Sequence, residues 1–258
     1  MRIVRDVAHV QRSKRRARWM ALAGFLMLGS TFWVLIFENL WILAYALMLA
    51  GFVVFNRGMQ EVGKWSRPVR NDQIIDQALA KTGDRYTLAH YTKAGGKLYE
   101  HLLIHPGGVV VFVTREMMGK VAVKEGRWRK RGGGVLRLFS MGGPQLGNPS
   151  YDTQKAVASL EALLAENDLD VPVDGAIVFT DPRADIEAEA PDWPVLLPRE
   201  LPLFVRDLPA EPELTMAERQ RLGEVLVGGQ LLETNAPVTR RRRPVKRRAG
   251  PAAKRPAA

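Results

Sequence analysis

The stretch KLYEHLLIHPGGVVVFVTREMMGK, residues 97–120, decides the fold of this chain. Residues 98–104 and 109–114 are two runs rich in apolar, aromatic and β-branched residues, a composition typical of β-strands. The Pro-Gly-Gly sequence at 106–108 supplies the residues that tight turns need, so the two runs predict a β-hairpin. The second run is apolar without interruption over residues 109–113, which predicts a strand buried on both faces.

The positive charge of the chain is concentrated at its two ends. The 258 residues carry a formal net charge of +11, of which residues 1–18 contribute +6 and residues 237–258 contribute +9. The segment between them is therefore mildly acidic, at −4, so the basic character of the chain does not indicate a folded nucleic-acid-binding domain. The chain has no cysteine, which excludes disulfides and thiolate metal sites.

Two apolar segments near the N-terminus predict a transmembrane hairpin over residues 19–56, preceded by a basic cytoplasmic segment over residues 1–18. Residues 19–37 and 40–55 contain no charged residue, and Glu38-Asn39 separates them. One helix over both segments would be about 55 Å long, far more than a hydrocarbon core of ~30 Å, so two spans with a tight turn fit better. Basic residues flank both outer ends, which by the positive-inside rule predicts an inner (cytoplasmic) membrane protein with both termini cytoplasmic. A signal peptide and a buried hairpin of a soluble protein are the alternatives.

The remainder of the chain predicts a linker, one α/β domain and a tail. We expect the linker over residues 57–70 and the domain over residues 71–229, in the order helix, three or more strands, helix, strand, helix. Residues 236–258 are rich in Arg, Lys, Pro and Ala, which cannot bury a core, so this tail is expected to be disordered.

Several motifs in this order resemble the nuclease-related domain (NERD) family, whose fold is that of the restriction-endonuclease-like PD-(D/E)xK enzymes. Residues 97–120 resemble the acid-His strand, Pro-Gly turn and Glu-x-Lys strand of that family, followed by Gly-Lys. Trp128 and the sequence NPSYDTQ at residues 148–154 are also similar to the family pattern. The resemblance extends from about residue 71 to residue 207 and implies a mixed central sheet flanked by helices.

The resemblance also implies a metal-dependent catalytic site, and this sequence departs from its pattern. Glu100 precedes His101 where the family has Asp, the acid of the Glu-x-Lys motif falls on Val113, and its Lys falls on Arg115. An acid of the first helix corresponds to Asp72, and the Asn-Pro to Gln motif ends at Gln154 with a longer spacing. The site that the resemblance implies therefore consists of Asp72, Glu100, Arg115 and Gln154.

The chemistry of these residues argues against metal-dependent cleavage. Alternate residues of a strand share a face, so Val113 and Arg115 would both be directed at a bound metal ion. Mg²⁺ takes oxygen ligands, and Val113 offers none. Arg115 can contact a phosphate but does not lose a proton to activate water. Glu116 should face the other side of the strand. We therefore expect no cofactor and no metal; if the domain is active, Asp72 and Glu100 would hold Mg²⁺.

Three further features have competing interpretations. His101 and His105 lie four residues apart, but a structural role is favoured over zinc binding because they lie in a strand that Pro106 follows. Trp128 stands among basic residues, which fits either a nucleic-acid stacking platform or a strand at a sheet edge. The tail can bind DNA or RNA phosphates or anionic lipid through seven cations, Arg240, Arg241, Arg242, Arg243, Lys246, Arg247 and Arg248.

Together these features predict a membrane-anchored nuclease-related domain that has lost catalysis and acts in binding or scaffolding, with nucleic acid as a candidate partner. The first alternative is an active, membrane-tethered, Mg²⁺-dependent nuclease. The second is a structural membrane protein whose domain binds another protein.

Overall fold

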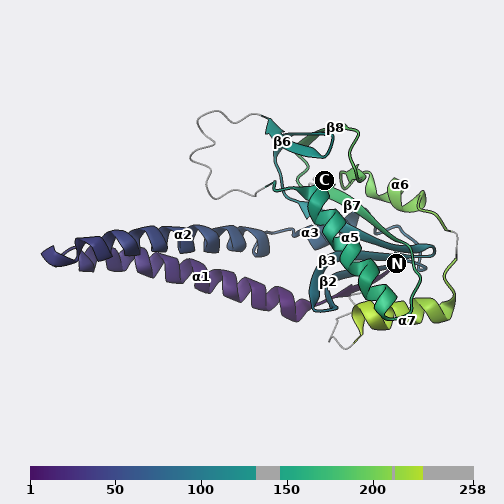
Figure 1. Cartoon of the computed structure of the whole chain (residues 1–258), viewed down its shortest axis with the longest axis horizontal. Helices are drawn as coiled ribbons and strands as arrows, with labels where there is room; N and C mark the ends of the chain where they lie inside the picture. Colours follow the sequence, from purple (N-terminus) through teal and green to yellow (C-terminus); the bar gives the residue numbers. More distant parts are fainter. Residues whose placement is uncertain (132–145, 211–212, 229–258) are drawn as a thin grey trace, which may run out of the picture.

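The computed structural model describes residues 1–131, 146–210 and 213–228. Within these ranges the chain forms a long helical hairpin and an α/β domain, and the hairpin projects from one end of the domain (Figure 1). The basic tail predicted over residues 236–258, with its seven candidate binding cations, lies outside the described residues.

A mixed six-stranded sheet in the order β1-β2-β3-β4-β7-β9 forms the centre of the domain. Its strands are β1 (Arg2–Arg5), β2 (Thr87–Ala94), β3 (Lys97–His105), β4 (Gly108–Arg115), β7 (Val173–Phe179) and β9 (Val195–Leu196). The predicted hairpin is confirmed, because β3 and β4 pair antiparallel on either side of the turn. β4 also pairs parallel with β7, and β1 pairs parallel with β2 at one edge of the sheet.

Helices cover both faces of this sheet, and β4 lies buried between them. On one face Val109 and Val111 pack with α5 (Pro149–Glu166) and α7 (Met216–Val227). On the other face Val110 and Phe112 pack with α3 (Asn71–Ala78) and α6 (Leu201–Arg206). This arrangement confirms the doubly buried strand that the apolar run predicts.

A second, three-stranded sheet in the order β6-β5-β8 lies at one end of the first. Its strands are β5 (Gly119–Lys124), β6 (Arg127–Arg131) and β8 (Ala184–Glu189). Val121 of β5 packs with Ile177 and Phe179 of β7, so the two sheets share a small apolar core. The domain is therefore the α/β fold that the sequence predicts, with one additional sheet.

The hairpin consists of α1 (Val7–Val34), a short 3₁₀ turn η1 (Glu38–Leu40) and α2 (Trp41–Trp65). Its buried residues recur at every seventh position, and most are small: Val10, Ala17, Gly24 and Thr31 on α1, and Ala44, Gly51, Gly58 and Trp65 on α2. A Cβ atom on Gly24 would lie 2.2 Å from the backbone nitrogen of Phe55, and one on Gly58 would lie 2.3 Å from that of Ala21. Glycine therefore permits the close approach of the two helices, as it does between helices in membranes.

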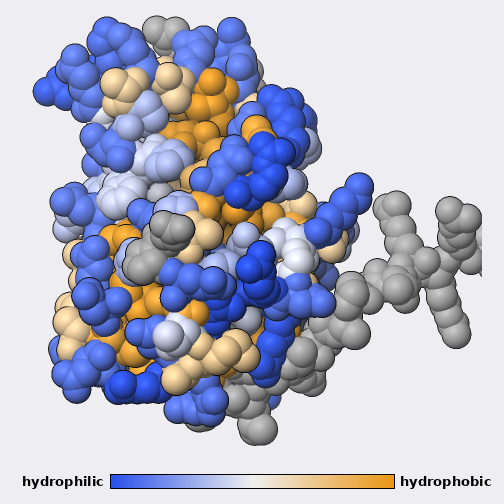
Figure 2. Space-filling view, turned by 90° about the vertical axis from the view of Figure 1, so that its right-hand side faces the viewer, coloured by the Kyte–Doolittle hydropathy of each residue, from blue (hydrophilic) through white to orange (hydrophobic). Residues whose placement is uncertain are grey.

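The outer surface of the hairpin is apolar. Phe32 and Trp33 are 75% and 74% exposed, and most of the exposed large apolar side chains of the described chain belong to α1 and α2. Both helices are long and apolar enough to cross a membrane. Figure 2 looks instead at the far end of the domain, where hydrophilic residues cover most of the surface and apolar residues form patches between them. The two helices and the turn at residues 38–40 agree with the predicted hairpin.

Two segment boundaries differ from those that the sequence predicts. Residues 1–18 do not form a separate N-terminal segment, because residues 2–5 join the sheet as β1 and α1 begins at Val7. The predicted linker over residues 57–70 is largely helical, because α2 continues to Trp65. Packing explains the second difference, since Val10 and Trp65 bury themselves against Tyr91 of β2. The hairpin is thus packed against the domain.

Candidate functional site

A cavity of about 470 Å³ opens where the hairpin meets the domain. The last turns of α2, around Lys64, form one wall, and Arg67 follows them. The neighbouring ends of β3 and β4, including Glu100 and Val113, form the floor, and the first turns of α5, at Asp152, form a further part of the lining. The cavity is therefore composite, because neither the hairpin nor the domain encloses it alone.

The cavity exists because β3 and β4 separate at this end of the sheet. Their ladder runs from the turn to the pair Leu102–Val111 and does not continue beyond it. Past that point a side-chain hydrogen bond links the strands, because Thr114 Oγ1 donates to Glu100 Oε2 at 3.3 Å. At the same level of the sheet, Tyr91 of β2 has φ 58°. A non-glycine residue in this left-handed region costs on the order of 1–3 kcal/mol and persists where the surrounding packing fixes it.

Three carboxylates of the cavity each form an ion pair with a cation. Lys64 Nζ lies 2.6 Å from Glu100 Oε1, and the guanidinium of Arg67 lies 2.6 Å from Glu116 Oε2. Arg115 forms an ion pair with Asp152 at the start of α5. Two of the three cations, Lys64 and Arg67, come from the end of α2 and the segment that follows it.

The charges that line the cavity balance each other. Val113 contributes an apolar side chain to the floor, and the charged residues of the lining are equal in number for the two signs. The acids are Glu61, Glu100, Glu116 and Asp152, and the bases are Lys64, Arg67, Lys97 and Arg115. A divalent cation is usually held by an excess of carboxylate charge. Among the described residues, no group of three or more His, Cys, Asp or Glu side chains is arranged to hold a metal ion.

The two glutamates of the cavity floor have opposite pKa shifts. Burial alone would raise the pKa of Glu100, but the charge of Lys64 and the hydrogen bonds from Lys64 and Thr114 bring this pKa below its ordinary value. Burial raises the pKa of Glu116, and the charge of Arg67 offsets this only in part. The negative charge of Glu100 adds to the rise, which indicates that the two carboxylates are close enough to repel each other.

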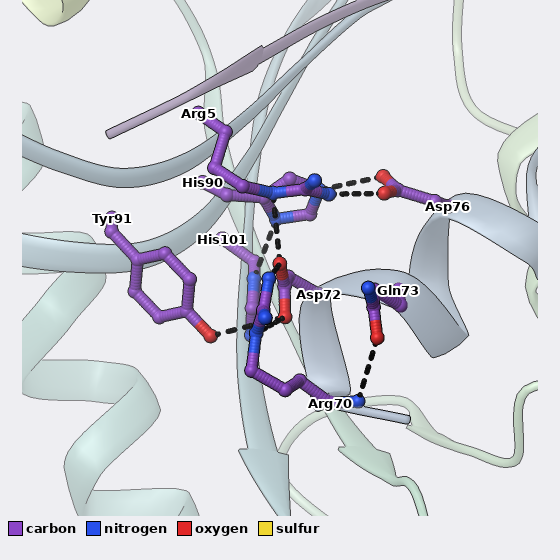
Figure 3. A network of polar contacts seen from close by, with 8 residues as sticks. All are labelled: Arg5, Arg70, Asp72, Gln73, Asp76, His90, Tyr91 and His101. Atoms are coloured by element: carbon purple, nitrogen blue, oxygen red, sulfur yellow. Dashed lines mark hydrogen bonds and ion pairs between the residues drawn. The ribbon is translucent and has the colours of Figure 1, made fainter. Parts of the chain in front are cut away.

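A second charged cluster lies in the interior beside α3 (Figure 3). Asp72 is fully buried, and Arg70 donates two hydrogen bonds to its carboxylate, at 3.0 and 2.9 Å. Arg5 of β1 lies 2.8 Å from the same carboxylate and also forms an ion pair with Asp76. Burial would raise the pKa of Asp72, but these two guanidinium groups lower it below its ordinary value.

Two histidines connect this cluster to the sheet. His90 Nε2 lies 2.8 Å from Asp76 Oδ1, and His90 Nδ1 lies 2.7 Å from His101 Nδ1. Since a carboxylate only accepts, we assign the Nε2 proton of His90 to the bond with Asp76, so that His101 donates from Nδ1 to His90. His101 Nε2 is then a buried acceptor without a partner among the described residues. Burial and the neighbouring His90 lower the pKa of His101 to about 3, so the ring is neutral at pH 7.

The structure separates the residues that the sequence assigns to one site. Glu100 and Arg115 line the cavity together with Val113, as their alternation on the strands predicts. Asp72 does not line it and belongs to the buried cluster. Gln154 is exposed on α5 and lies outside the cavity lining, whereas Asp152, two residues earlier, is part of it.

The sequence also misplaces or misses several residues of the cavity. Glu116 lines it, although strand alternation predicts the opposite face, because β4 ends at Arg115 and alternation ends with it. Lys64 and Arg67 fall in the predicted linker, so no motif points to them. Among the cavity residues that the sequence analysis did not name, Asp152 could have been found from sequence, since it lies within the NPSYDTQ motif.

The remaining candidates have structural contacts. Trp128 is partly buried against Phe179, and its Nε1 donates to Ser150 Oγ at 2.9 Å, which favours a packing role over a stacking platform. His105 is buried at the turn, where its Nδ1 accepts a hydrogen bond from the backbone N–H of Gly107 at 3.3 Å.

Residues 69–180 match the family model described as nuclease-related domain. No curated protein and no solved structure is significantly similar to the chain. The matched region begins just before α3 and ends just after β7, so it contains α3, β3, β4 and α5, from which the domain's share of the cavity lining comes.

Proposed function

Because residues 69–180 form a nuclease-related domain, we propose that this chain is a membrane-anchored protein whose domain binds a partner and does not cleave nucleic acid. The ion pairs of the cavity carry this proposal. Glu100, Glu116 and Asp152 are each neutralised by a lysine or an arginine of the chain itself. A metal ion would have to displace these cations, which are already within contact distance of the carboxylates.

The donor set of the cavity does not fit a resident Mg²⁺ ion. Mg²⁺ requires oxygen ligands in near-octahedral geometry and keeps several waters. Val113 has no donor atom at the position where the resemblance implies an acid, and Asp72 is held in the interior by Arg5 and Arg70. The balanced charge of the lining also removes the electrostatic attraction that a divalent cation needs. We therefore derive no catalytic step through a metal.

The hairpin supports membrane anchoring. Its large apolar side chains point outward and its small residues point inward, which is opposite to the arrangement in a soluble helical hairpin. The pairing of β1 with β2 supports placing the N-terminus on the same side of the membrane as the domain. The basic residues that flank both outer ends favour the cytoplasmic side of an inner membrane.

This geometry brings the cavity close to the bilayer surface. Lys64 follows the uncharged segment that ends at Phe55 by nine residues, which corresponds to about 13 Å along a helix. Nucleic acid is the candidate partner. The sequence of the tail, residues 236–258, contains cations that can contact phosphates, and Arg115 at the cavity is a further candidate contact.

The test uses the full chain in nanodiscs of neutral lipid, incubated with single- and double-stranded DNA and with Mg²⁺ or Mn²⁺. We expect no cleavage, and DNA binding that weakens as salt rises. The logarithm of the binding constant falls linearly with the logarithm of the salt concentration, and each phosphate contact adds about 0.9 to the steepness of this salt slope for duplex DNA. The R240Q/R241Q/R242Q variant should therefore lower the salt slope by up to about 2.7. The matched control, R127Q/R129Q/K130Q, removes three cations of β6 and should lower the slope less.

One observation favours the metal-dependent nuclease as a second candidate. Glu100, Glu116 and Asp152 line the same cavity, so three carboxylates are available if their cations move away. The same assay decides between the two functions. Metal-dependent cleavage that disappears in Glu100→Ala would contradict the binding proposal and establish the nuclease. If the salt slope of DNA binding decreases equally in both triple variants, the tail arginines make no specific contribution to DNA binding.

A further inference from the structure

A hollow on the side of α1 lies at the boundary between its charged and its apolar part. Its volume is about 480 Å³, and its lining residues are Gln11, Lys14, Arg15, Arg18, Trp19 and Leu22. Each of these residues lies three or four positions from at least one other along α1, so they share one face of the helix. The hollow is separate from the cavity between the hairpin and the domain, with which it has no lining residue in common.

The three cations of this hollow have no acidic partner among the described residues. Lys14, Arg15 and Arg18 form no ion pair there, although Arg12, one turn earlier, lies 3.9 Å from Asp6. The corresponding part of α2 is different, because Arg57 pairs with Glu61 at 3.3 Å. The charge at the boundary is therefore unbalanced on α1 only.

The same face of α1 continues as an apolar surface. Phe25, Leu26 and Trp33 follow Leu22 by three, four and eleven residues, and all three are exposed. A molecule that occupies this face would meet cations first, then the indole of Trp19, and then several turns of apolar side chains. An anionic phospholipid has this order of groups, with a phosphate above and an acyl chain below.

From this order of groups we infer that the hollow is a binding site for an anionic phospholipid. Lys14, Arg15 and Arg18 bind the phosphate of the headgroup, and Trp19 and Leu22 contact the start of an acyl chain. The inference rests on the membrane anchoring proposed above, and it deepens that proposal by naming a lipid class and a site. It is distinct from lipid binding by the tail, because the residues belong to a helix of fixed geometry.

Nucleic acid fits the hollow less well than lipid. Arg18 borders directly on the uncharged segment that begins at Trp19, so a polyanion that reached Arg18 would also contact the apolar surface or the bilayer. A free phosphate fits the cations but leaves Trp19 and Leu22 unused. The apolar half of the lining thus distinguishes a lipid from the other phosphate-bearing ligands.

The experiment titrates short-chain phosphatidylglycerol into the detergent-solubilised full chain, with phosphatidylcholine of the same chain length as the neutral reference. R15Q/R18Q is compared with R12Q/R16Q, which removes two arginines of the same helix that do not line the hollow. A basic residue near a lipid surface contributes roughly a fivefold change in affinity. We expect R15Q/R18Q to bind phosphatidylglycerol about 30-fold more weakly and R12Q/R16Q to change by less than about threefold.

The outcomes separate this inference from the proposed function. Equal weakening in both double variants, or none in R15Q/R18Q, would overturn the site. If glycerol phosphate binds as tightly as phosphatidylglycerol, the ligand is a free phosphate and the lipid inference is wrong. Extraction of membranes with alkaline carbonate tests the anchor independently. Release of the chain by carbonate would overturn the membrane anchoring, whereas a retained chain with unchanged lipid affinity in R15Q/R18Q overturns only the lipid site.

Discussion

Glu100 and His101 are neighbours on β3, yet they belong to two charged clusters that differ in their access to solvent. Glu100 lines the cavity and forms an ion pair there with Lys64. About a third of each side chain is exposed, 34% for Glu100 and 37% for Lys64. His101 contributes to the buried cluster, in which Asp72 has no exposed surface. The same kinds of ion pair therefore have different consequences. Those of the cavity are accessible from solvent, whereas those of the interior hold β1, α3 and the sheet together.

The largest expected effect comes from breaking the buried cluster. Asp72→Asn would leave the charges of Arg5 and Arg70 without their common carboxylate. Removing one partner of a buried ion pair typically costs about 3–5 kcal/mol, because the remaining charge stays desolvated. We expect a loss of this size in the free energy of unfolding, measured by denaturant titration of the detergent-solubilised chain.

The matched control for this variant is Asp185→Asn on β8. Asp185 lies 3.8 Å from Lys120, and both side chains are 61% exposed, so its removal should cost no more than about 1 kcal/mol. Similar losses in the two variants would show that Asp72 has no special structural role.

The next effect is a loss of stability in acid that originates from His101. Its pKa is about 3 in the folded chain and near 6.5 in the unfolded chain, so between these values the unfolded state binds more protons. The contribution of His101 to the free energy of unfolding is fully present above about pH 6.5. It falls by about 1.4 kcal/mol for each pH unit down to about pH 3. Unfolding measured between about pH 7 and pH 4 should show this slope, and His101→Asn should reduce it.

His105 supplies the comparison for the acid effect. Burial also lowers the pKa of His105, and the charge of Asp174 opposes this shift, so His105→Asn should reduce the slope too. Parallel pH profiles for the wild type and His101→Asn would contradict the assignment of the acid loss to His101.

The mixed sheet is implied by the family resemblance, whereas local patterns are sufficient to predict the hairpin of β3 and β4 and the two long apolar helices. The reason is that these elements depend on short-range features, such as an uninterrupted apolar run at residues 109–113 or a Pro-Gly-Gly turn. The sequence also indicates that Glu100, Val113 and Arg115 lie together, because β3 and β4 pair across one turn.

The rest of the site depends on contacts between distant segments. Lys64 reaches Glu100 only because α2 continues past the apolar segment and packs on Tyr91. Arg5 reaches Asp72 only because residues 2–5 join the far edge of the sheet. A basic residue ahead of an apolar helix is interpreted as a membrane flank, so its role in the interior of the domain could not be foreseen from sequence.

A smaller effect is expected from the cavity variant Glu100→Gln. The lowered pKa of Glu100 means that its charged form stabilises the folded chain above about pH 4.5 and that this contribution is lost as the pH falls further. Solvent screening limits the contribution, since exposed ion pairs are typically worth about 0–1 kcal/mol. We expect Glu100→Gln to cost less than about 1 kcal/mol at neutral pH in the same titration. A loss as large as that of Asp72→Asn would remove the distinction between the two clusters.

The smallest effect, with the opposite sign, is expected from Glu116→Gln. Burial raises the pKa of Glu116 despite Arg67, so the charged form is less favourable in the folded chain than in the unfolded chain. The contribution of Glu116 to the free energy of unfolding is therefore lost as the pH rises through the pKa that Glu116 has in the folded chain. The neutral glutamine avoids that loss. At neutral pH we expect Glu116→Gln to be as stable as the wild type or slightly more stable, within about 0.5 kcal/mol. A clear destabilisation would mean that the Arg67 pair outweighs burial, and the cavity would then resemble the buried cluster in its dependence on intact ion pairs.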